Sequence, residues 1–335
     1  MLNLKDTYGK HCTIVLYVDD LLVLAENENM ITELHSQLTA RFDGVSISTD
    51  TDLSYLGMHI CLKDGYVTVS MQAYLEGVLQ ECGTTGVVST PATAGLFNNG
   101  DDQLLNEKES KWFHTVVAKL LYLATRVRVD ILLVVIYLCT RVQEPTITDQ
   151  IKLTRVLKYL NGTRQKGLLL KPDTMRIRAY IDAAFACHPN GKSHSGLVVT
   201  VGGATVLCKS QKQKIVTKDS TEAELVALSD MLICVTQCHD FLLGQGVNME
   251  APIVLQDNTS TITLVTQDGG KYRNKYMLVR RSCVREQVDR GDVVIEYSPT
   301  KSMLADALTK PLQGALLRYM ISEITGESQD ITGVR

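Results

Sequence analysis

The sequence contains no apolar run long enough to cross a membrane as a helix. Its longest uninterrupted apolar stretch, Ile131 to Cys139, has nine residues, about half of what a membrane-spanning helix needs. The short apolar stretch near the amino terminus continues into Asp19 and Asp20 without a small-residue cleavage site, unlike a signal peptide. We therefore expect a soluble, intracellular protein that has no membrane partner.

The spacing of the cysteine and histidine residues also indicates neither a disulfide framework nor a zinc site. The nine cysteines of this 335-residue chain are scattered without even spacing, which is typical of reduced intracellular thiols. The tightest group, Cys234, Cys238 and His239, lies on a predicted helix and has no second pair of ligands nearby. Ordinary core cysteines are the favoured interpretation there, and also for the Cys and His residues in 187–194.

The chain has little excess charge of either sign. Its net charge is -3, whereas nucleic-acid-binding domains are usually basic. Two local groups of basic residues are nevertheless dense enough to face phosphates. The first contains Lys209, Lys212, Lys214 and Lys218, and the second contains Lys271, Arg273, Lys275, Arg280, Arg281 and Arg285. Solvated faces of a hairpin and a helix remain the alternative interpretation.

The first 83 residues are predicted to form a small α+β unit. Two β-rich runs within 13–25 indicate a hairpin with acidic residues at its turn. Apolar residues at helical spacing predict a helix over 29–42, and a single strand follows over 53–62. A short strand is predicted over 66–70 and a helix over 72–81.

The middle of the chain is predicted to be a linker followed by helices. Residues 84–110 are rich in Gly, Thr and Asn and contain Pro91, which is typical of a linker. From 111 to 161 the apolar pattern is helical, with Pro145 separating two helices. Residues 111–170 are therefore interpreted as a helical connection.

In residues 171–313 the sequence pattern is a mixture of strand-like and helical segments. Residues 314–335 are interpreted as a carboxyl-terminal tail. We expect five strands in the order β-β-β-α-β-α-α-β-α with their helices, and a hairpin turn at Gly202-Gly203. The predicted strands are 176–181, 196–201, 204–208, 253–256 and 293–297. The predicted helices are 221–243, 259–267, 274–289 and 302–309. The fold class is therefore α/β.

Four acidic residues in this last region lie in apolar or small-residue surroundings. Asp182 follows the first predicted strand, Asp257 follows the fourth, Glu224 is in the first turns of the long helix and Asp306 is in the last helix. A sheet backed by the long helix brings such residues together, and carboxylates are the ligands that Mg²⁺ or Mn²⁺ prefers. Two ions roughly 3.5 to 4 Å apart can hydrolyse a phosphodiester. Taken singly, Asp257 has capping of the helix near Thr259 as its alternative role, and the helix glutamates have a solvated helix face as theirs.

Nine sequence blocks, in one order, resemble the carboxyl-terminal part of a copia-type retrotransposon Pol polyprotein. The blocks cover nearly the whole chain. They are YVDDLLVL, LSYLGMHI, AKLLYLATRVRVDI, VLKYLNGT, DAAFACHPNGKSHSG, STEAELVAL, QDNTS, VREQV and IEYSPTKSMLADALTKPLQG.

The resemblance implies that the first 83 residues are the end of a reverse-transcriptase palm with a thumb-like segment. In that family the YVDD turn would hold the polymerase metals through Asp19 and Asp20. The family's third metal-binding Asp and its fingers lie upstream of this sequence. We therefore expect no RNA-directed DNA polymerase activity from this chain alone.

The same resemblance implies an RNase H-like mixed-sheet domain over 171–313. Asp182, Glu224, Asp257 and Asp306 would be its catalytic residues and would bind two Mg²⁺ or Mn²⁺ ions. Glu224 is preferred to Glu222 because the family's glutamate precedes the apolar residue that begins the buried stripe. One departure is Tyr276, where many relatives have His.

Two function hypotheses follow. The first is a ribonuclease H that cuts RNA in RNA–DNA hybrids, with other polyprotein chains as further partners and with cytoplasmic retroelement particles as its place of action. In this first hypothesis, basic residues at five positions bind the hybrid: Lys209, Lys212, Lys214, Lys275 and Arg280. The second is a catalytically inactive relic that at most binds nucleic acid.

Overall fold

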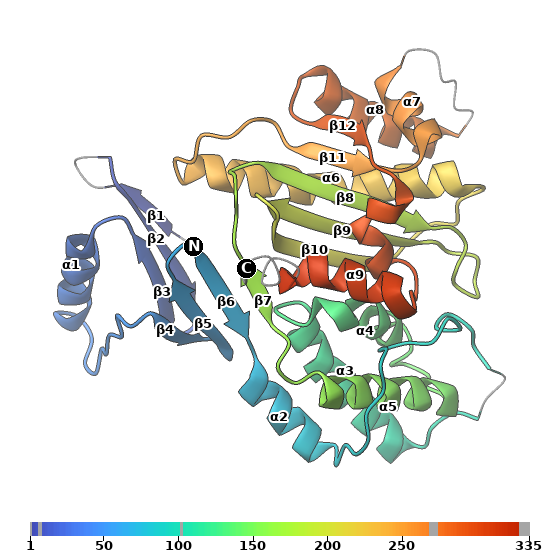
Figure 1. Ribbon diagram of the computed structural model, residues 1–335, viewed down its shortest axis with the longest axis horizontal. Helices are drawn as coiled ribbons and strands as arrows, with labels where there is room; N and C mark the ends of the chain where they lie inside the picture. Colours follow the sequence, from blue (N-terminus) through green and yellow to red (C-terminus); the bar gives the residue numbers. More distant parts are fainter. Residues whose placement is uncertain (1, 6–8, 101–102, 268–273, 328–335) are drawn as a thin grey trace, which may run out of the picture.

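The computed structural model describes residues 2–5, 9–100, 103–267 and 274–327. These residues form three separate β-sheets, with helices packed between and around them (Figure 1). The smaller sheets belong to the amino-terminal part of the chain, and a five-stranded sheet belongs to the carboxyl-terminal part. Helices from the middle of the chain lie below the five-stranded sheet in the view of Figure 1.

The first sheet is an antiparallel sheet of three strands, followed by helix α1 (Glu28–Thr39). Its strands are β1 (Leu2–Lys5), β2 (His11–Tyr17) and β3 (Asp20–Ala25). The predicted hairpin is confirmed, and its turn at Val18 and Asp19 has a left-handed backbone at Val18, with φ of 51°.

The second sheet has four antiparallel strands. They are β4 (Asp52–Tyr55), β5 (Met58–Lys63), β6 (Tyr66–Ser70) and β7 (Leu168–Leu170). The expected single strand over 53–62 is wrong, because Leu56 and Gly57 both have positive φ, 51° and 72°, and turn the chain back on itself. Strand β7 was not predicted; it occupies the end of the range 111–170 that was expected to be a helical connection, and it pairs with β6.

The segment after α2 (Gln72–Glu81) contains no helix or longer strand between residue 84 and Asn106, within the part that the structure describes. It is not loose, since Leu96 and Phe97 are buried in a hydrophobic core. The predicted linker extends too far, because α3 begins at Glu107. A capping box between Asn106 and Glu109 starts the helix there.

The helical connection has three α-helices rather than the two expected. They are α3 (Glu107–Ala124), α4 (Leu132–Cys139), preceded by the 3₁₀ turn η1 (Val129–Ile131), and α5 (Ile147–Gly162). The unexpected break falls at Arg128, whose backbone is not helical and whose guanidinium is buried against Asp130. The predicted break at Pro145 is confirmed, and Thr146 and Asp149 form a capping box there.

The five-stranded sheet has the order β10-β9-β8-β11-β12. Its strands are β8 (Ile177–Ala184), β9 (His194–Val201), β10 (Ala204–Lys212), β11 (Ile253–Gln256) and β12 (Val294–Tyr297). Strand β11 is parallel to both β8 and β12, whereas β9 is antiparallel to β8 and β10. The predicted turn at Gly202-Gly203 is confirmed, with positive φ at both residues.

Helices cover both faces of this sheet. One face packs on α6 (Ser220–Gly244), beside which lie α7 (Thr259–Thr266) and α8 (Lys275–Asp289). Consecutive residues such as Tyr180 and Ile181 in β8 face the two different cores, as the two-residue period of a strand requires. By length and composition α6 could cross a membrane, but ten of its residues are buried in the protein, and eight of these belong to the hydrophobic core that it shares with the sheet.

The carboxyl-terminal segment differs from the prediction in two ways. The expected helix over 302–309 is a pair of 3₁₀ turns, η2 (Thr300–Ser302) and η3 (Leu304–Leu308), with η3 lying directly on β8 and β9. The expected tail contains a helix, α9 (Gly314–Thr325), which buries Leu317 and Met320 against the helical connection. Its amphipathic spacing was in the sequence and was overlooked.

Candidate metal centre

Three of the four predicted carboxylates meet at one place in the structure. Asp182 is in β8, Glu224 is in the first turns of α6, and Asp257 directly follows β11. One carboxylate oxygen from each lies within 4.8 Å of the others. Asp182 and Glu224 are buried, with 1% and 5% of their surface exposed, and Asp257 is half-buried. Asp182 lies within its strand and not after it as expected, because β8 extends to Ala184.

The fourth predicted carboxylate, Asp306, reaches this group through a lysine. Asp306 lies in η3 and is buried. The Lys310 ammonium is 2.6 Å from Asp306 Oδ1 and 3.3 Å from Asp182 Oδ1. Asp306 is thus outside the group of three, and the ammonium links it to Asp182.

Hydrogen bonds from uncharged side chains fix the orientation of three of the carboxylates. The Thr309 hydroxyl donates to Asp182 Oδ2, and the Thr300 hydroxyl donates to Asp257 Oδ2 at 2.8 Å. Gln256 Nε2 donates to Glu224 Oε2 at 3.3 Å. The same Gln256 side chain accepts from the backbone N–H of Asp257 at 2.9 Å, so one amide orients two of the acids. Sequence reasoning missed Thr309, Gln256 and Lys310.

Burial and mutual repulsion raise the pKa values of two of these acids. Burial, with Asp182 and Asp257 nearby, raises the pKa of Glu224 well above its ordinary value. Burial and the charge of Asp182 also raise the pKa of Asp306 to about 7, although the Lys310 ammonium opposes that shift. Negative charge at this place is therefore costly, and a cation lowers that cost.

Hydrogen bonds at the starts of α6 and α7 distinguish the acids of this site from neighbouring polar residues that only begin a helix. The α7 helix is capped by Asn258, which accepts from the backbone N–H of Thr261, so Asp257 is not its cap. Glu222 accepts from the backbone N–H of Lys218 at 2.9 Å, just before α6. Glu222 therefore has a role at the helix start, and Glu224 is the glutamate that faces the other acids.

A glycine on β9 allows η3 to approach the sheet. Gly196 is paired with Asp182 in the strand register. A Cβ atom on Gly196 would lie 2.7 Å from Thr309 Cγ2 and 3.0 Å from the Ala305 carbonyl oxygen. The absence of a side chain there lets Asp306, Thr309 and Lys310 reach the carboxylate group.

The donor set fits a small, hard divalent cation. Three carboxylates converge with no cysteine or histidine in the group, and oxygen ligands of this kind are those that Mg²⁺ and Mn²⁺ prefer. Buried acids that repel one another are a known sign of a functional site rather than of a structural one. The residues present therefore suit the ions that the sequence predicted.

The first part of the chain matches a polymerase family, described as reverse transcriptase (RNA-dependent DNA polymerase), over residues 3–94. The Transposon Ty1-DR6 Gag-Pol polyprotein of Saccharomyces cerevisiae is 26% identical over 325 residues, which cover 90% of this chain. The retrovirus-related Pol polyprotein from transposon RE1 of Arabidopsis thaliana is 28% identical over 318 residues, which cover 93% of it. The chain is similar to copia-type retrotransposon Pol polyproteins. The resemblance inferred from the nine sequence blocks is thereby confirmed.

The match covers only a part of these Pol polyproteins. The chain spans 18% of the Ty1-DR6 polyprotein and 21% of the RE1 polyprotein. Among solved structures, LC11-RNase H1 in complex with RNA/DNA hybrid covers 40% of this chain and 94% of its own, at 22% identity and a TM-score of 0.32. The foamy viral protease-reverse transcriptase in complex with RNA/DNA hybrid covers 86% and 36%, at 10% identity and a TM-score of 0.48. The predicted α/β fold class, with its mixed five-stranded sheet, is confirmed.

The two acids of the YVDD turn lie apart from the carboxylate group. Asp19 and Asp20 are exposed at the turn between β2 and β3. No third acidic or histidine ligand joins them within the described ranges. Their neighbours Tyr17 and Val18 are also exposed, by 54% and 76%.

The predicted nucleic-acid-binding residues lie on two elements of the Pol-related chain. Lys209 and Lys212 are on β10, and Lys214 follows it. Lys275 is exposed at the start of α8. Arg280 differs from these lysines because it forms an ion pair with Asp230 of α6.

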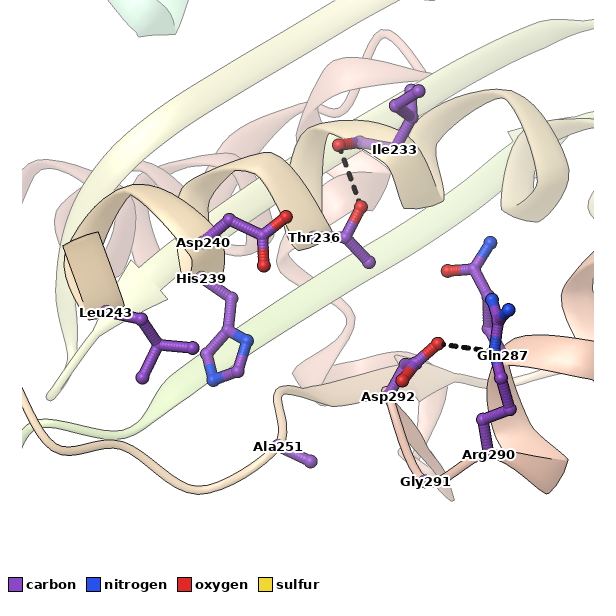
Figure 2. A pocket seen from close by; sticks show the side chains of 10 residues that line it. All are labelled: Ile233, Thr236, His239, Asp240, Leu243, Ala251, Gln287, Arg290, Gly291 and Asp292. Carbon is purple, nitrogen blue, oxygen red and sulfur yellow. Dashed lines mark hydrogen bonds and ion pairs between the residues drawn. The ribbon is translucent and has the colours of Figure 1, made fainter.

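A cavity of about 590 Å³ lies elsewhere, along the second half of α6 (Figure 2). Figure 2 shows His239 and Leu243 of α6 on one side and Arg290 and Asp292 on the other. Its wall includes two buried polar atoms without a hydrogen-bond partner, His239 Nε2 and Gln287 Oε1. Glu224 is in the first turns of the same helix, so the cavity is separate from the carboxylate group.

Proposed function

We propose that this chain acts as a ribonuclease H, which hydrolyses the RNA strand of an RNA–DNA hybrid. The observation that carries the proposal is the meeting of Asp182, Glu224 and Asp257 from β8, α6 and the end of β11. The relationship to retrotransposon Pol polyproteins supports it, because copying RNA into DNA produces such hybrids.

The residues of the site each have a definite task in this proposal. Asp182, Glu224 and Asp257 would hold Mg²⁺ or Mn²⁺, and Asp306 would serve a second ion. Bound divalent ions would supply a water of lowered pKa and stabilise the leaving 3′-oxygen. Thr309, Thr300 and Gln256 keep the carboxylates oriented, and such outer hydrogen bonds commonly decide metal affinity.

Binding of the hybrid would use shape and charge. In this proposal the hybrid's phosphates would be contacted by Lys209, Lys212 and Lys214, on and after β10, and by Lys275 on α8. Recognition of an RNA-containing duplex rests on its minor-groove shape and 2′-hydroxyl groups more than on base sequence. Arg280 would contribute less, because Asp230 already neutralises its charge.

The test is cleavage of a labelled RNA–DNA hybrid in Mg²⁺ or Mn²⁺ by the whole chain. We expect wild-type cleavage and a loss of at least about 100-fold in Asp257→Asn, since the substitution removes a metal ligand. Asp240→Asn is the matched control, because Asp240 is an exposed acid near the other end of α6.

Three outcomes would separate the hypotheses. Cleavage that disappears in Asp257→Asn and persists in Asp240→Asn supports the ribonuclease. A folded wild-type chain that cuts no hybrid with either ion contradicts it and favours an inactive retroelement relic. Equal cleavage by wild type and Asp257→Asn would point to a contaminating nuclease.

A further inference from the structure

Lys310 lies among the carboxylates of the candidate metal centre and not at its rim. Its ammonium contacts one oxygen of Asp306 at 2.6 Å and one oxygen of Asp182 at 3.3 Å. The two acids are 5% and 1% exposed in their side chains, whereas that of Lys310 is 38% exposed. The cation thus enters from the solvent side and bridges two buried acids.

This bridge divides the four carboxylates into two sets. Asp182, Glu224 and Asp257 share one place, and Asp306 is outside it. An ion bound by the first set does not need the space of the ammonium, because a carboxylate offers about four lone-pair positions. An ion bound between Asp182 and Asp306 would need the position that Lys310 Nζ now takes.

We propose that Lys310 is a resident cation at the second metal position, so that the chain takes up divalent ions in two unequal steps. The first ion binds at Asp182, Glu224 and Asp257 while Lys310 stays in place. The second binds between Asp182 and Asp306 only when the ammonium moves out toward the solvent. This inference rests on the proposed function, since it concerns the order in which that site is filled.

The local structure supports a swinging lysine. Lys310 follows η3, and its backbone N–H donates to the Asp306 carbonyl oxygen at 2.9 Å, which fixes its Cα close to the site. Lysine carries a compact charge on a flexible four-carbon stem, so the ammonium can leave while the backbone stays. Asp182 keeps its hydrogen bond from Thr309 in either position of the lysine, because the two donors use different oxygens.

An ordinary ion pair is the competing explanation. Lys310 and Asp306 are four residues apart, a spacing that often gives pairs of little energetic effect on exposed helices. A pair of that kind would leave the number and the affinity of bound metal ions unchanged when the lysine is removed. The two explanations therefore differ in metal binding as well as in activity.

The experiment is a titration of the metal-free whole chain with Mn²⁺, followed by calorimetry and by the electron paramagnetic resonance signal of free Mn²⁺. We expect one tight and one weak ion in the wild type. In Lys310→Met, the weak ion should bind at least about tenfold more tightly, because a unit positive charge a few ångströms away is gone. Lys310→Arg keeps the charge and should retain the unequal steps.

Two further variants complete the test. Asp306→Asn should lose the weak ion and keep the tight one, and it leaves Lys310 in place if Lys310→Met does not fold. Lys111→Met is the matched control, because the Lys111 side chain on α3 is 77% exposed. It should bind ions as the wild type does.

Identical binding curves for wild type and Lys310→Met, or loss of the tight ion in Asp306→Asn, would overturn the role of Lys310. Either result leaves the ribonuclease proposal intact if the wild type still cuts the hybrid. A wild-type chain that binds no Mn²⁺ would overturn both proposals.

Discussion

Two glutamates that stand two positions apart on α6 have different neighbours. The Glu222 carboxylate accepts a backbone N–H from Lys218 at 2.9 Å, and the Glu222 backbone N–H donates to the helix cap Asp219. Glu224 faces Asp182 and Asp257 instead. Charge and helix position are nearly the same for both residues, so only the contacts distinguish a helix-start residue from a candidate ligand.

A second single-residue effect concerns Asp306, which should make the stability of the metal-free chain depend on pH. Its pKa is raised to about 7 in the folded chain, against about 3.9 for an unperturbed Asp. The folded state therefore binds the proton more tightly. Protonation of Asp306 therefore stabilises the folded chain in full below pH 4, and this stabilisation is lost as the pH rises toward 7.

We expect Asp306→Asn to unfold at a higher temperature than wild type at pH 8 in EDTA. The gain should be on the order of 2 kcal/mol. At about pH 3 the two chains should differ little, because wild-type Asp306 is then protonated in the folded state and mostly protonated in the unfolded state. Thermal unfolding at both pH values measures this, and a difference that does not change with pH would contradict the assigned pKa.

At the scale of elements, the position of η3 depends on its close packing against β9. Gly196→Ala would place a methyl group 2.7 Å from Thr309 Cγ2 and 3.1 Å from Leu308 Cβ. Overpacking of this kind costs about 1 to 3 kcal/mol. The movement of η3 would also displace Asp306 and Lys310 from the carboxylate group.

Gly196→Ala is therefore expected to lower both the free energy of unfolding and the rate of hybrid cleavage. Urea denaturation and the cleavage assay measure the two effects. The control is Gly77→Ala in α2, where a Cβ meets nothing within 4 Å and where alanine favours the helix by about 1 kcal/mol. Wild-type stability in Gly196→Ala would show that η3 is not held by this contact.

At the scale of the whole molecule, the helical connection and the five-stranded sheet share one hydrophobic core. Residues of α3, α4 and α5 pack in the same cluster as Val198 of β9, Leu308 of η3 and Met320 of α9. The ion pair of Arg128 and Asp130, 2% and 1% exposed in their side chains, lies within this region. We therefore expect the two parts to unfold together.

Asp130→Asn tests this coupling. Breaking a buried pair leaves an uncompensated charge and costs about 3 to 5 kcal/mol. Trp112, the single tryptophan, reports on α3 by fluorescence, and Mn²⁺ binding reports on the five-stranded sheet. Both transitions should shift to lower urea concentration by the same amount.

Glu107→Gln, which breaks an exposed pair on α3, should shift neither transition. Separate midpoints in Asp130→Asn would show two independent parts.

Features that depend on neighbouring residues follow from the amino-acid sequence alone. Strand β11 and helix α2 were predicted with the bounds that the structure has, because alternation and helical spacing are local. The Gly202-Gly203 turn followed from the backbone freedom of glycine. The candidate acids were found from their apolar surroundings and from the resemblance, and the sites themselves stay predictions.

Which side chains meet depends on how the elements pack in three dimensions. Lys310 and Thr309 reach Asp182 across more than a hundred residues of sequence, and β7 joins a sheet whose other strands lie before the helical connection. Such contacts depend on how sheets and helices pack, which the period of one segment does not encode. Spacing along the chain therefore predicted many of the elements and the candidate acids, whereas packing brought the Lys310 ammonium between Asp182 and Asp306.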